Sequence, residues 1–325
     1  MAPNWLTSFS SLFSMEQLIS KTGQNLIILL YHGINDGKEI PFIDPLYPSR
    51  SAATFEKDIQ FLTAHFESVS LSQIYQQEGK FERPSFHITF DDGLRSVYDE
   101  ALPILRKYDV DASVYLNNDF IDNKHLFYRY KVALIISKLK SDVSLKNKLE
   151  KYQPPHTIYA WLREMKYADS NVIDEIAFDI GLDFGHFLQT EKPYLGTAQI
   201  EEMQKLGVAF GAHSFDHQLV QGNKQNMLEE ISRSMKDIQS RFGIDLRAFA
   251  FPFTDAGLQN EELQKLSNAV DISFGTAGLK LDTATQHYQR IPMEKEKADA
   301  AAIIKNTYLY YWLTRIIGKH KISRA

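Results

Sequence analysis

Apolar residues recur along the first part of the chain with two different spacings, which predict alternating strands and helices. A continuous apolar run, LIILLY at residues 26–31, is typical of a strand that is buried on both faces. Other short runs predict strands at 69–71, 87–90 and 112–116. Apolar residues three and four positions apart predict helices at 52–66, 72–77 and 97–107.

The same alternation returns later in the chain, after an interval that is helical throughout. In that interval, residues 122–195, the pattern predicts helices at 130–139, 144–152, 157–165 and 171–180. Strands are then expected at 208–211, 246–251, 272–275 and 288–292, with helices at 197–206, 224–242 and 260–267. Strands that alternate with helices favour parallel βα units. We therefore expect either an α/β barrel or a doubly wound sheet, interrupted by a helical insertion.

Composition excludes several classes of function. Of 325 residues, 36 are Lys or Arg and 41 are Asp or Glu, so the formal net charge is −5. With no basic field and no nucleic-acid motif, we expect no nucleic-acid partner. The chain has no cysteine, which removes disulfides, thiol nucleophiles and cysteine-based metal sites.

Residues 1–25 form an N-terminal extension before the first predicted strand. They lack the charged start and the continuous apolar core of a secretory signal. No run of about 18 apolar residues, the length that spans a bilayer, occurs along the chain. From the sequence alone we expect a cytoplasmic protein.

Two adjacent carboxylates, Asp91 and Asp92, follow the predicted strand at 87–90 in the sequence HITFDDG. Gly93 permits a sharp turn directly after them. One hypothesis is that an aspartate caps the next helix. The other is that both belong to a catalytic site, because the carboxyl ends of barrel strands converge on one place.

A histidine pair follows another predicted strand, in GVAFGAHSFDH at residues 207–217. On a helical turn the spacing of His213 and His217 would place both imidazoles on one face, where they could share a metal ion. Ordinary structural histidines are the alternative. One carboxylate and two imidazoles make an open metal site, and a second carboxylate beside it could act as general base.

Three motifs resemble those of a known family. TFDDG (89–93), HSFDH (213–217) and AFAFPF (248–253) are similar, in this order, to the first three motifs of the polysaccharide deacetylases. These are the family-four carbohydrate esterases with the NodB-homology domain. The resemblance covers residues 26–120 and 195–293. It implies a distorted (β/α) barrel of about seven strands within residues 26–295, with 122–195 as the insertion.

The resemblance also implies roles for individual residues. Asp91 is expected to be the catalytic base, and Asp92, His213 and His217 the ligands of a divalent metal ion. We expect zinc, although such a ligand set also accepts other divalent ions. Phe253 matches the residue after the motif proline, whose backbone N–H helps hold the developing oxyanion.

The chain departs from the family pattern at the third motif. The family usually has an arginine two residues before the proline, directed at the catalytic aspartate, and here that residue is Ala250. Arg290, in the sequence QRIP, is the replacement that we expect. The alternative is that Arg290 is an ordinary surface or ion-pair residue.

A second departure concerns the family's late L-x-L-x-H motif, which supplies the general-acid histidine. Nothing after Phe253 matches it, but LIILLYHG at residues 26–33 has this shape and ends in His32. This resembles the permuted arrangement of the poly-N-acetylglucosamine deacetylases. We therefore expect His32 to be the general acid, with a loop-anchoring histidine as the alternative. In a closed barrel the first and last strands are neighbours, so permutation leaves the site intact.

Residues 296–325 have the pattern of a basic amphipathic helix. After Asp299 there is no acidic residue, and the basic ones are Lys305, Arg315, Lys319, Lys321 and Arg324. An apolar stripe is formed by Ile304, Tyr308, Tyr311, Trp312 and Ile316. Such a helix can lie on an anionic membrane surface, giving peripheral membrane contact. We favour the alternative that the stripe packs on the barrel.

Together these features predict a metal-dependent hydrolase that removes N-acetyl groups from a sugar. Water activated by the metal would attack the acetyl carbonyl, and His32 would protonate the departing amine. The expected substrate is an N-acetylated oligosaccharide, polysaccharide or lipid-linked glycan. Two alternatives stay open. One is an O-acetyl ester hydrolase, and the other is a carbohydrate-binding pseudoenzyme, for which Ala250 is the best support.

Overall fold

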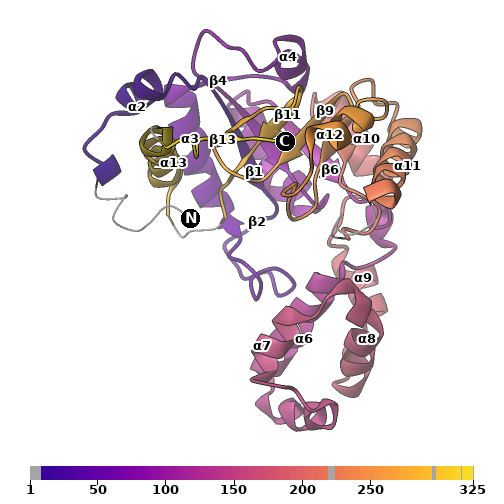
Figure 1. Ribbon diagram of the computed structural model, residues 1–325. Helices are drawn as coiled ribbons and strands as arrows, with labels where there is room; N and C mark the ends of the chain where they lie inside the picture. Colours follow the sequence, from indigo (N-terminus) through magenta and orange to yellow (C-terminus); the bar gives the residue numbers. More distant parts are fainter. Residues whose placement is uncertain (1–8, 219–223, 295–297, 316, 325) are drawn as a thin grey trace.

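A parallel sheet that curls into a nearly closed barrel forms the centre of the computed structural model (Figure 1). The structure describes residues 9–218, 224–294, 298–315 and 317–324. In spatial order the barrel strands are β11 (His287–Gln289), β9 (Ile272–Gly275), β8 (Ala248–Ala250), β7 (Ala209–Ala212), β6 (Ala112–Leu116), β5 (Ser85–Phe90), β1 (Leu26–Tyr31) and β12 (Ile291–Pro292). Each strand is parallel to its neighbours on this path.

The two strands at the ends of this path close the barrel. β11 and β12 are separated in sequence by Arg290 alone, yet β11 pairs with β9 and β12 pairs with β1. Residues 287–292 therefore act as one interrupted strand that joins the two edges of the sheet. Counted this way, the barrel has seven strands. The predicted α/β barrel is confirmed, and its first and last strands are neighbours.

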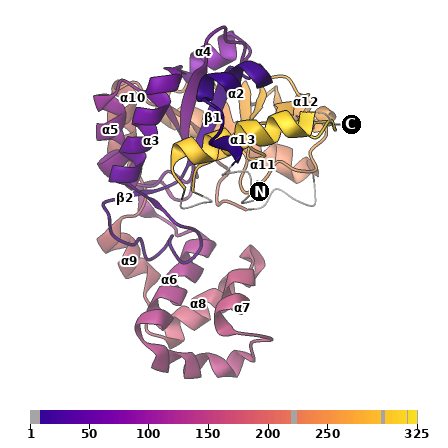
Figure 2. The same ribbon diagram turned by 90° about the vertical axis from the view of Figure 1, so that its left-hand side faces the viewer.

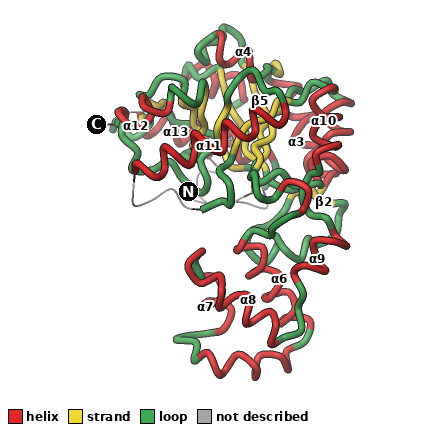
Figure 3. The backbone as a smooth tube through the Cα atoms, turned by 90° about the vertical axis from the view of Figure 1, so that its right-hand side faces the viewer, coloured by secondary structure: helices red, strands yellow, loops and turns green. Residues whose placement is uncertain are grey.

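Helices surround the barrel on its outside, as Figure 3 shows. They are α3 (Ala52–His65), α4 (Leu71–Gln76), a π-helical turn (Val97–Ala101) that leads into α5 (Leu102–Lys107), α10 (Thr197–Lys205), α11 (Lys224–Phe242) and α12 (Asn260–Leu266). The strand predicted at 69–71 is wrong. The strand there is β4 (Glu67–Ser68), and Ser70 caps α4 by accepting a hydrogen bond from the backbone N–H of Gln73.

Alternate residues of the barrel strands face the helices and the barrel interior. In β1, Ile27 and Leu29 belong to the apolar layer beneath the helices, whereas Ile28 packs in the interior with Tyr115 of β6. In β5 the same alternation puts Phe90 in the outer layer. The residue after it, Asp91, is therefore directed into the barrel.

The segment between the barrel motifs is helical and protrudes from the barrel (Figures 1 and 2). Its helices are α6 (Tyr128–Ser141), a 3₁₀ segment (Val143–Tyr152), α7 (Ile158–Glu164), α8 (Ser170–Asp179) and α9 (Phe184–Glu191), of which α9 was not predicted. Buried apolar residues such as Ile136, Leu162 and Ile173 give this segment a core of its own.

Both ends of the described chain pack against the barrel. α13 (Ala300–Arg315) lies along α2 (Met15–Thr22) and α3 (Figure 2). Ile304, Tyr308 and Tyr311 are buried, and the Tyr308 hydroxyl donates to the carbonyl of Gln24 at 2.8 Å. These three stripe residues are covered by protein, which confirms the packing alternative. Ile316 lies outside the described residues.

Short two-stranded sheets complete the fold. β2 (Ile34–Asn35) pairs with β3 (Arg50–Ser51), and β10 (Leu281–Asp282) pairs with β13 (Lys321–Ile322) near the C-terminus. Within the described part of the chain, every helix is too short or too polar to cross a membrane.

Candidate active site

The two aspartates lie where β5 ends and the chain turns sharply. The backbone N–H of Asp91 donates to the carbonyl of Tyr31 at 3.0 Å, which continues the pairing with β1. Asp92 then adopts a left-handed φ of 68°, followed by Gly93 at 62°. This turn allows consecutive carboxylates to line the same cavity. The helix-capping hypothesis is wrong, because the N-cap position of the next helix is Ser96.

The histidine pair comes from a loop, so the expected helical turn is wrong. The backbone at Ser214 and His217 is left-handed, with φ values of 69° and 59°. These two reversals, and not a helical repeat, bring the rings of His213 and His217 to a centroid distance of 4.7 Å. Asn117, at the end of β6, fixes the loop by donating to the carbonyl of His213 at 2.5 Å.

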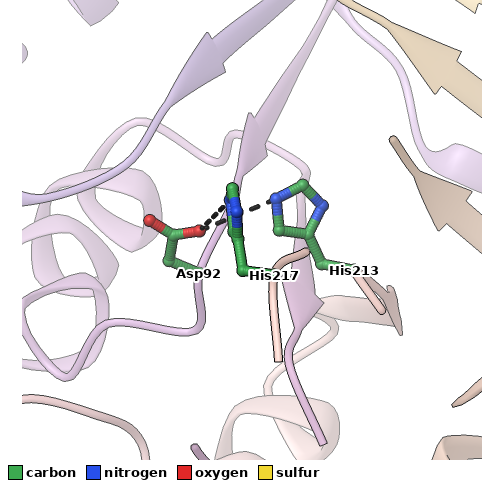
Figure 4. Close-up of side chains that lie close together, drawn as sticks. All are labelled: Asp92, His213 and His217. Atoms are coloured by element: carbon green, nitrogen blue, oxygen red, sulfur yellow. Dashed lines mark ion pairs between the residues drawn. The ribbon is translucent and has the colours of Figure 1, made fainter. Parts of the chain in front are cut away.

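Asp92, His213 and His217 point toward one another (Figure 4). The Oδ1 atom of Asp92 lies 3.1 Å from Nε2 of His217 and 3.6 Å from Nε2 of His213. Nδ1 of His213 donates to the carbonyl of Ala250 at 2.7 Å, so its Nε2 lone pair faces the carboxylate. Burial lowers the pKa of His213 to about 4, which keeps the imidazole in the neutral form that binds metals.

This donor set fits a divalent metal ion. Asp92 Oδ1 is buried and accepts no hydrogen bond from the residues that the structure describes. Buried carboxylate oxygens are ordinarily satisfied, and a cation held jointly with the two imidazoles would satisfy this one. One carboxylate and two neutral imidazoles leave coordination positions open, as in catalytic zinc sites.

A second group of side chains with metal-ligand chemistry lies outside the lining of the cavity that contains Asp92, His213 and His217. It consists of Asp255, Asp282 and His287. The guanidinium of Arg324 already lies among them, with Nε 2.8 Å from Asp282 Oδ1 and Nη2 3.0 Å from His287 Nε2. Because a permanent cation compensates these carboxylates, we assign no metal to this group.

Arg290 holds Asp91 through two hydrogen bonds in the barrel interior. Its Nη1 and Nη2 donate to Oδ1 and Oδ2 of Asp91 at 2.6 and 2.8 Å. Nε donates to the carbonyl of Gly275 at 3.2 Å, which orients the guanidinium. Burial alone would raise the pKa of Asp91, but the charge and hydrogen bonds of Arg290, together with the nearby His213 and His32, outweigh burial and hold the pKa below its usual value. Arg290 is fully buried, so the surface alternative is wrong.

His32 is paired with Glu294, which sequence reasoning missed. The backbone N–H of His32 donates to Oε1 of Glu294 at 2.8 Å, and Nδ1 lies 2.5 Å from Oε2. Burial alone would lower the pKa of His32, but the charge and hydrogen bond of Glu294 raise it to about 9. This pairing leaves Nε2 as the ring nitrogen that can serve a substrate.

One cavity of about 330 Å³ at the carboxyl ends of the strands is lined by the two adjacent aspartates, the histidine pair, His32 and Glu294. Its walls include the side chains of Tyr47, Phe127, Arg129 and Phe253. Phe253 has a left-handed φ of 58°, and its ring centroid lies 4.6 Å from that of His217. The Thr276 hydroxyl donates to the carbonyl of Phe253 at 3.1 Å, which anchors this loop.

The helical insertion also contributes side chains to the site. Phe127 and Arg129 line the cavity, and the Tyr130 hydroxyl donates to Oδ2 of Asp92. Sequence reasoning missed all three, because the helical pattern of this segment carries no signal of which residues reach the barrel.

Comparison with known proteins connects this geometry with a family. The family model for polysaccharide deacetylases matches residues 78–274, more than half of the chain. A poly-beta-1,6-N-acetyl-D-glucosamine N-deacetylase of Staphylococcus aureus is 33% identical over 100 residues, which cover 26% of this chain and 34% of that relative. The corresponding protein of Staphylococcus epidermidis is 37% identical over 70 residues, covering 21% and 24%. The match thus spans about a third or less of these curated relatives.

Solved structures share the fold. The Streptococcus pyogenes deacetylase PplD, in complex with acetate, superposes with a TM-score of 0.56 at 15% identity, covering 87% of this chain and 97% of that one. IcaB from Ammonifex degensii superposes with a TM-score of 0.53 at 14% identity, covering 88% and 97%. At such identities the likeness concerns the fold alone.

Proposed function

Because the chain belongs to the polysaccharide deacetylase family, we propose that it is a metal-dependent hydrolase that removes N-acetyl groups from an N-acetylated polysaccharide. One observation carries the proposal. A carboxylate held ionised by Arg290, a metal-ligand set and a histidine with a raised pKa all line the same cavity. These are the groups that amide hydrolysis requires.

Asp92, His213 and His217 would hold the divalent ion, which we expect to be zinc. Bound there, the ion would supply Lewis acidity that polarises the acetyl carbonyl and makes water more acidic. Two observations support this assignment: the neutral state of His213, and Oδ1 of Asp92, which accepts no hydrogen bond from the described residues.

Asp91 serves as the general base. It takes a proton from the water whose oxygen forms the new bond to the acetyl carbon. Arg290 fixes the carboxylate by a bidentate pair and disfavours its protonation in the resting state. The family pattern gives this role to an arginine at the position of Ala250. Here Arg290 supplies it from the segment between β11 and β12 that closes the barrel.

His32 serves as the general acid. Since its pKa is raised to about 9, the imidazolium is the main form at neutral pH. Its proton passes to the amide nitrogen as the carbon–nitrogen bond breaks, so that acetate and a free amine leave. Glu294 holds the ring by Nδ1 and stabilises the charged form before the transfer.

Phe253 supplies a backbone N–H to the oxygen that becomes negatively charged when water adds to the carbonyl. A fixed backbone donor is effective because it needs no reorganisation during the reaction. The anchoring of this loop by Thr276 and the position of Phe253 beside His217 support the assignment.

The substrate that we propose is a polymer of N-acetylglucosamine. The names of the staphylococcal relatives support this class, as does the permuted order of motifs with His32 on the first strand. Amide cleavage is favoured over ester cleavage, because an amine needs a proton to leave and His32 is held protonated. The pseudoenzyme hypothesis loses its main support, since Arg290 occupies the role left open by Ala250.

Acetate release tests the proposal. Zinc-loaded protein is incubated with β-1,6-linked N-acetylglucosamine oligosaccharides, in parallel with an Asp91→Asn variant of equal zinc content. We expect acetate from the wild type and little from the variant. Equal background release from both proteins would contradict the proposed activity, and release from O-acetylated sugars only would identify an esterase.

A further inference from the structure

The two oxygens of the Asp92 carboxylate have different surroundings. Oδ2 accepts a hydrogen bond from the hydroxyl of Tyr130, which belongs to α6 of the helical insertion. Oδ1 is buried, accepts no hydrogen bond within the described part of the chain, and lies 3.1 Å from Nε2 of His217. One oxygen is therefore occupied by a protein donor, while the other faces the metal-ligand imidazoles.

Tyr130 is held firmly in this position. Its ring is buried and makes edge contacts with Phe42 and Phe127 at centroid distances of 5.3 and 5.1 Å. On its third side it stacks on Tyr194 at 6.4 Å. Its hydroxyl is also 3.1 Å from that of Tyr47, in the loop after β2. The phenol is thus fixed by packing from both the insertion and the barrel loops.

A carboxylate at the end of a sharp turn has two equivalent oxygens that can exchange by rotation about the Cβ–Cγ bond. A donor bound to one oxygen removes this freedom and presents the other in a single orientation. Groups that hydrogen-bond to metal ligands act in this way, and their loss typically weakens metal binding by about 10–100-fold.

We propose that Tyr130 is a positioning residue for the metal site, which holds Asp92 so that Oδ1 alone is directed at the ion. The inference rests on the metal site of the proposed function, but not on the reaction that it performs. It gives the insertion a function, since residues of the barrel proper supply the ligands and the insertion fixes the orientation of one of them.

Zinc affinity, measured by competition with a chromogenic chelator, tests this role. Tyr130→Phe removes only the hydroxyl and is expected to bind zinc about 10–100-fold more weakly than the wild type. Tyr194→Phe is the matched control. It removes a hydroxyl from the same aromatic wall, where that group accepts a hydrogen bond from the backbone N–H of Phe127 at 3.1 Å and makes none to Asp92 among the described residues. Its zinc affinity is expected to equal that of the wild type.

Cobalt substitution supplies a readout that a loss of packing alone would not change. The visible absorption of bound Co²⁺ depends on ligand number and geometry, so we expect an altered spectrum in Tyr130→Phe and the wild-type spectrum in Tyr194→Phe. If both variants bind zinc with wild-type affinity, or lose affinity equally, the proposal is wrong.

If Tyr130→Phe fails to fold, Tyr47→Phe takes its place. This variant removes the hydroxyl beside that of Tyr130 and is expected to weaken zinc binding, by less than Tyr130→Phe. Zinc affinity equal to that of Tyr194→Phe would then overturn the proposal. If the wild type releases no acetate but Tyr130→Phe binds zinc more weakly than the wild type, the proposed function is wrong and this inference stands. If the wild type releases acetate and Tyr130→Phe binds zinc with wild-type affinity, this inference is wrong and the proposed function stands.

Discussion

Arg290 and Asp91 are 199 residues apart in the sequence and form a bidentate pair in the barrel interior. The pair depends on barrel closure, because Arg290 is the single residue between β11 and β12. On one side of Arg290 the chain pairs with β9, and on the other side it pairs with β1. The same residue thus lies where the barrel closes and orients the carboxylate that we propose as the general base.

Arg290→Lys is expected to lower kcat without changing zinc content. Lysine keeps the charge but cannot donate two parallel hydrogen bonds to a carboxylate, so Asp91 loses its fixed orientation. General-base catalysis typically supplies about 10²–10⁴-fold, and the loss should remain below that of removing the base. Steady-state kinetics with a zinc assay measure both quantities. An unchanged kcat would show that the pair is only structural.

The two aspartates should separate into base and ligand. Asp91→Asn is expected to retain zinc and lose about 10²–10⁴-fold in rate, because only the base is removed. Asp92→Asn should lose zinc, since its Oδ1 faces both imidazoles. Metal analysis after gel filtration compares them, with His213→Ala as a ligand control. Equal zinc loss in both aspartate variants would mean that the roles are wrongly assigned.

Local sequence patterns were sufficient for part of this site. Asp91, Asp92, His213 and His217 lie in short motifs after strands, and any barrel brings such positions together. The backbone of the histidine loop was not predictable in this way, because the left-handed φ at Ser214 and His217 depends on tertiary contacts such as that with Asn117. The spacing identified a histidine pair that the structure does bring together, but for the wrong local reason.

The missed residues became apparent only from long-range pairing. Leu30 lies opposite Pro292 in the parallel register of β1 and β12, so two residues further on His32 meets Glu294. This relationship is invisible until the barrel closes. Tyr130 reaches Asp92 from a helix whose pattern predicts its own core, not its contact with the barrel.

The charge of Glu294 should set the alkaline limb of the activity profile. The groups that act on His32 are Glu294, Asp91 and Asp92, and they raise its pKa to about 9 against the opposing effect of burial. The acid form therefore predominates below about pH 9 and is lost above it. Glu294→Gln removes the negative charge that raises the pKa of His32 most, so the alkaline limb of the kcat/KM profile should move to lower pH. A limb that stays in place would show that another group is the acid.

His32→Ala should discriminate between amide and ester substrates. An amine must be protonated to depart, whereas an aryl acetate has a leaving oxygen that needs little protonation. We expect amide cleavage to fall by about 10²–10⁴-fold while aryl-ester turnover is spared. Zinc content should not change, because His32 is outside the ligand set. If the ratio of amide to ester turnover is the same as in the wild type, His32 is a structural histidine.

Arg324 should stabilise the folded chain rather than serve a surface interaction. The sequence pattern places it among the basic residues of the C-terminal segment, but its side chain is buried and contacts both Asp255 and Asp282. Burial alone would raise the pKa of each carboxyl. Hydrogen bonds and nearby positive charge outweigh that effect and hold both pKa values below the usual range.

Arg324→Met is therefore expected to lower the free energy of unfolding by about 3–5 kcal/mol at pH 7, because it removes the permanent positive charge that is paired with two buried carboxylates. A carboxyl with a lowered pKa contributes stability above its unfolded pKa of about 4 and loses it as the pH falls through the folded value. The difference between variant and wild type should consequently shrink below pH 4. Urea unfolding at several pH values measures it. Lys321→Met, at an exposed position of β13, is the matched control and should change stability by less than about 0.5 kcal/mol. Equal stability of the two variants at pH 7 would show that the buried ion pairs of Arg324 contribute nothing to the fold.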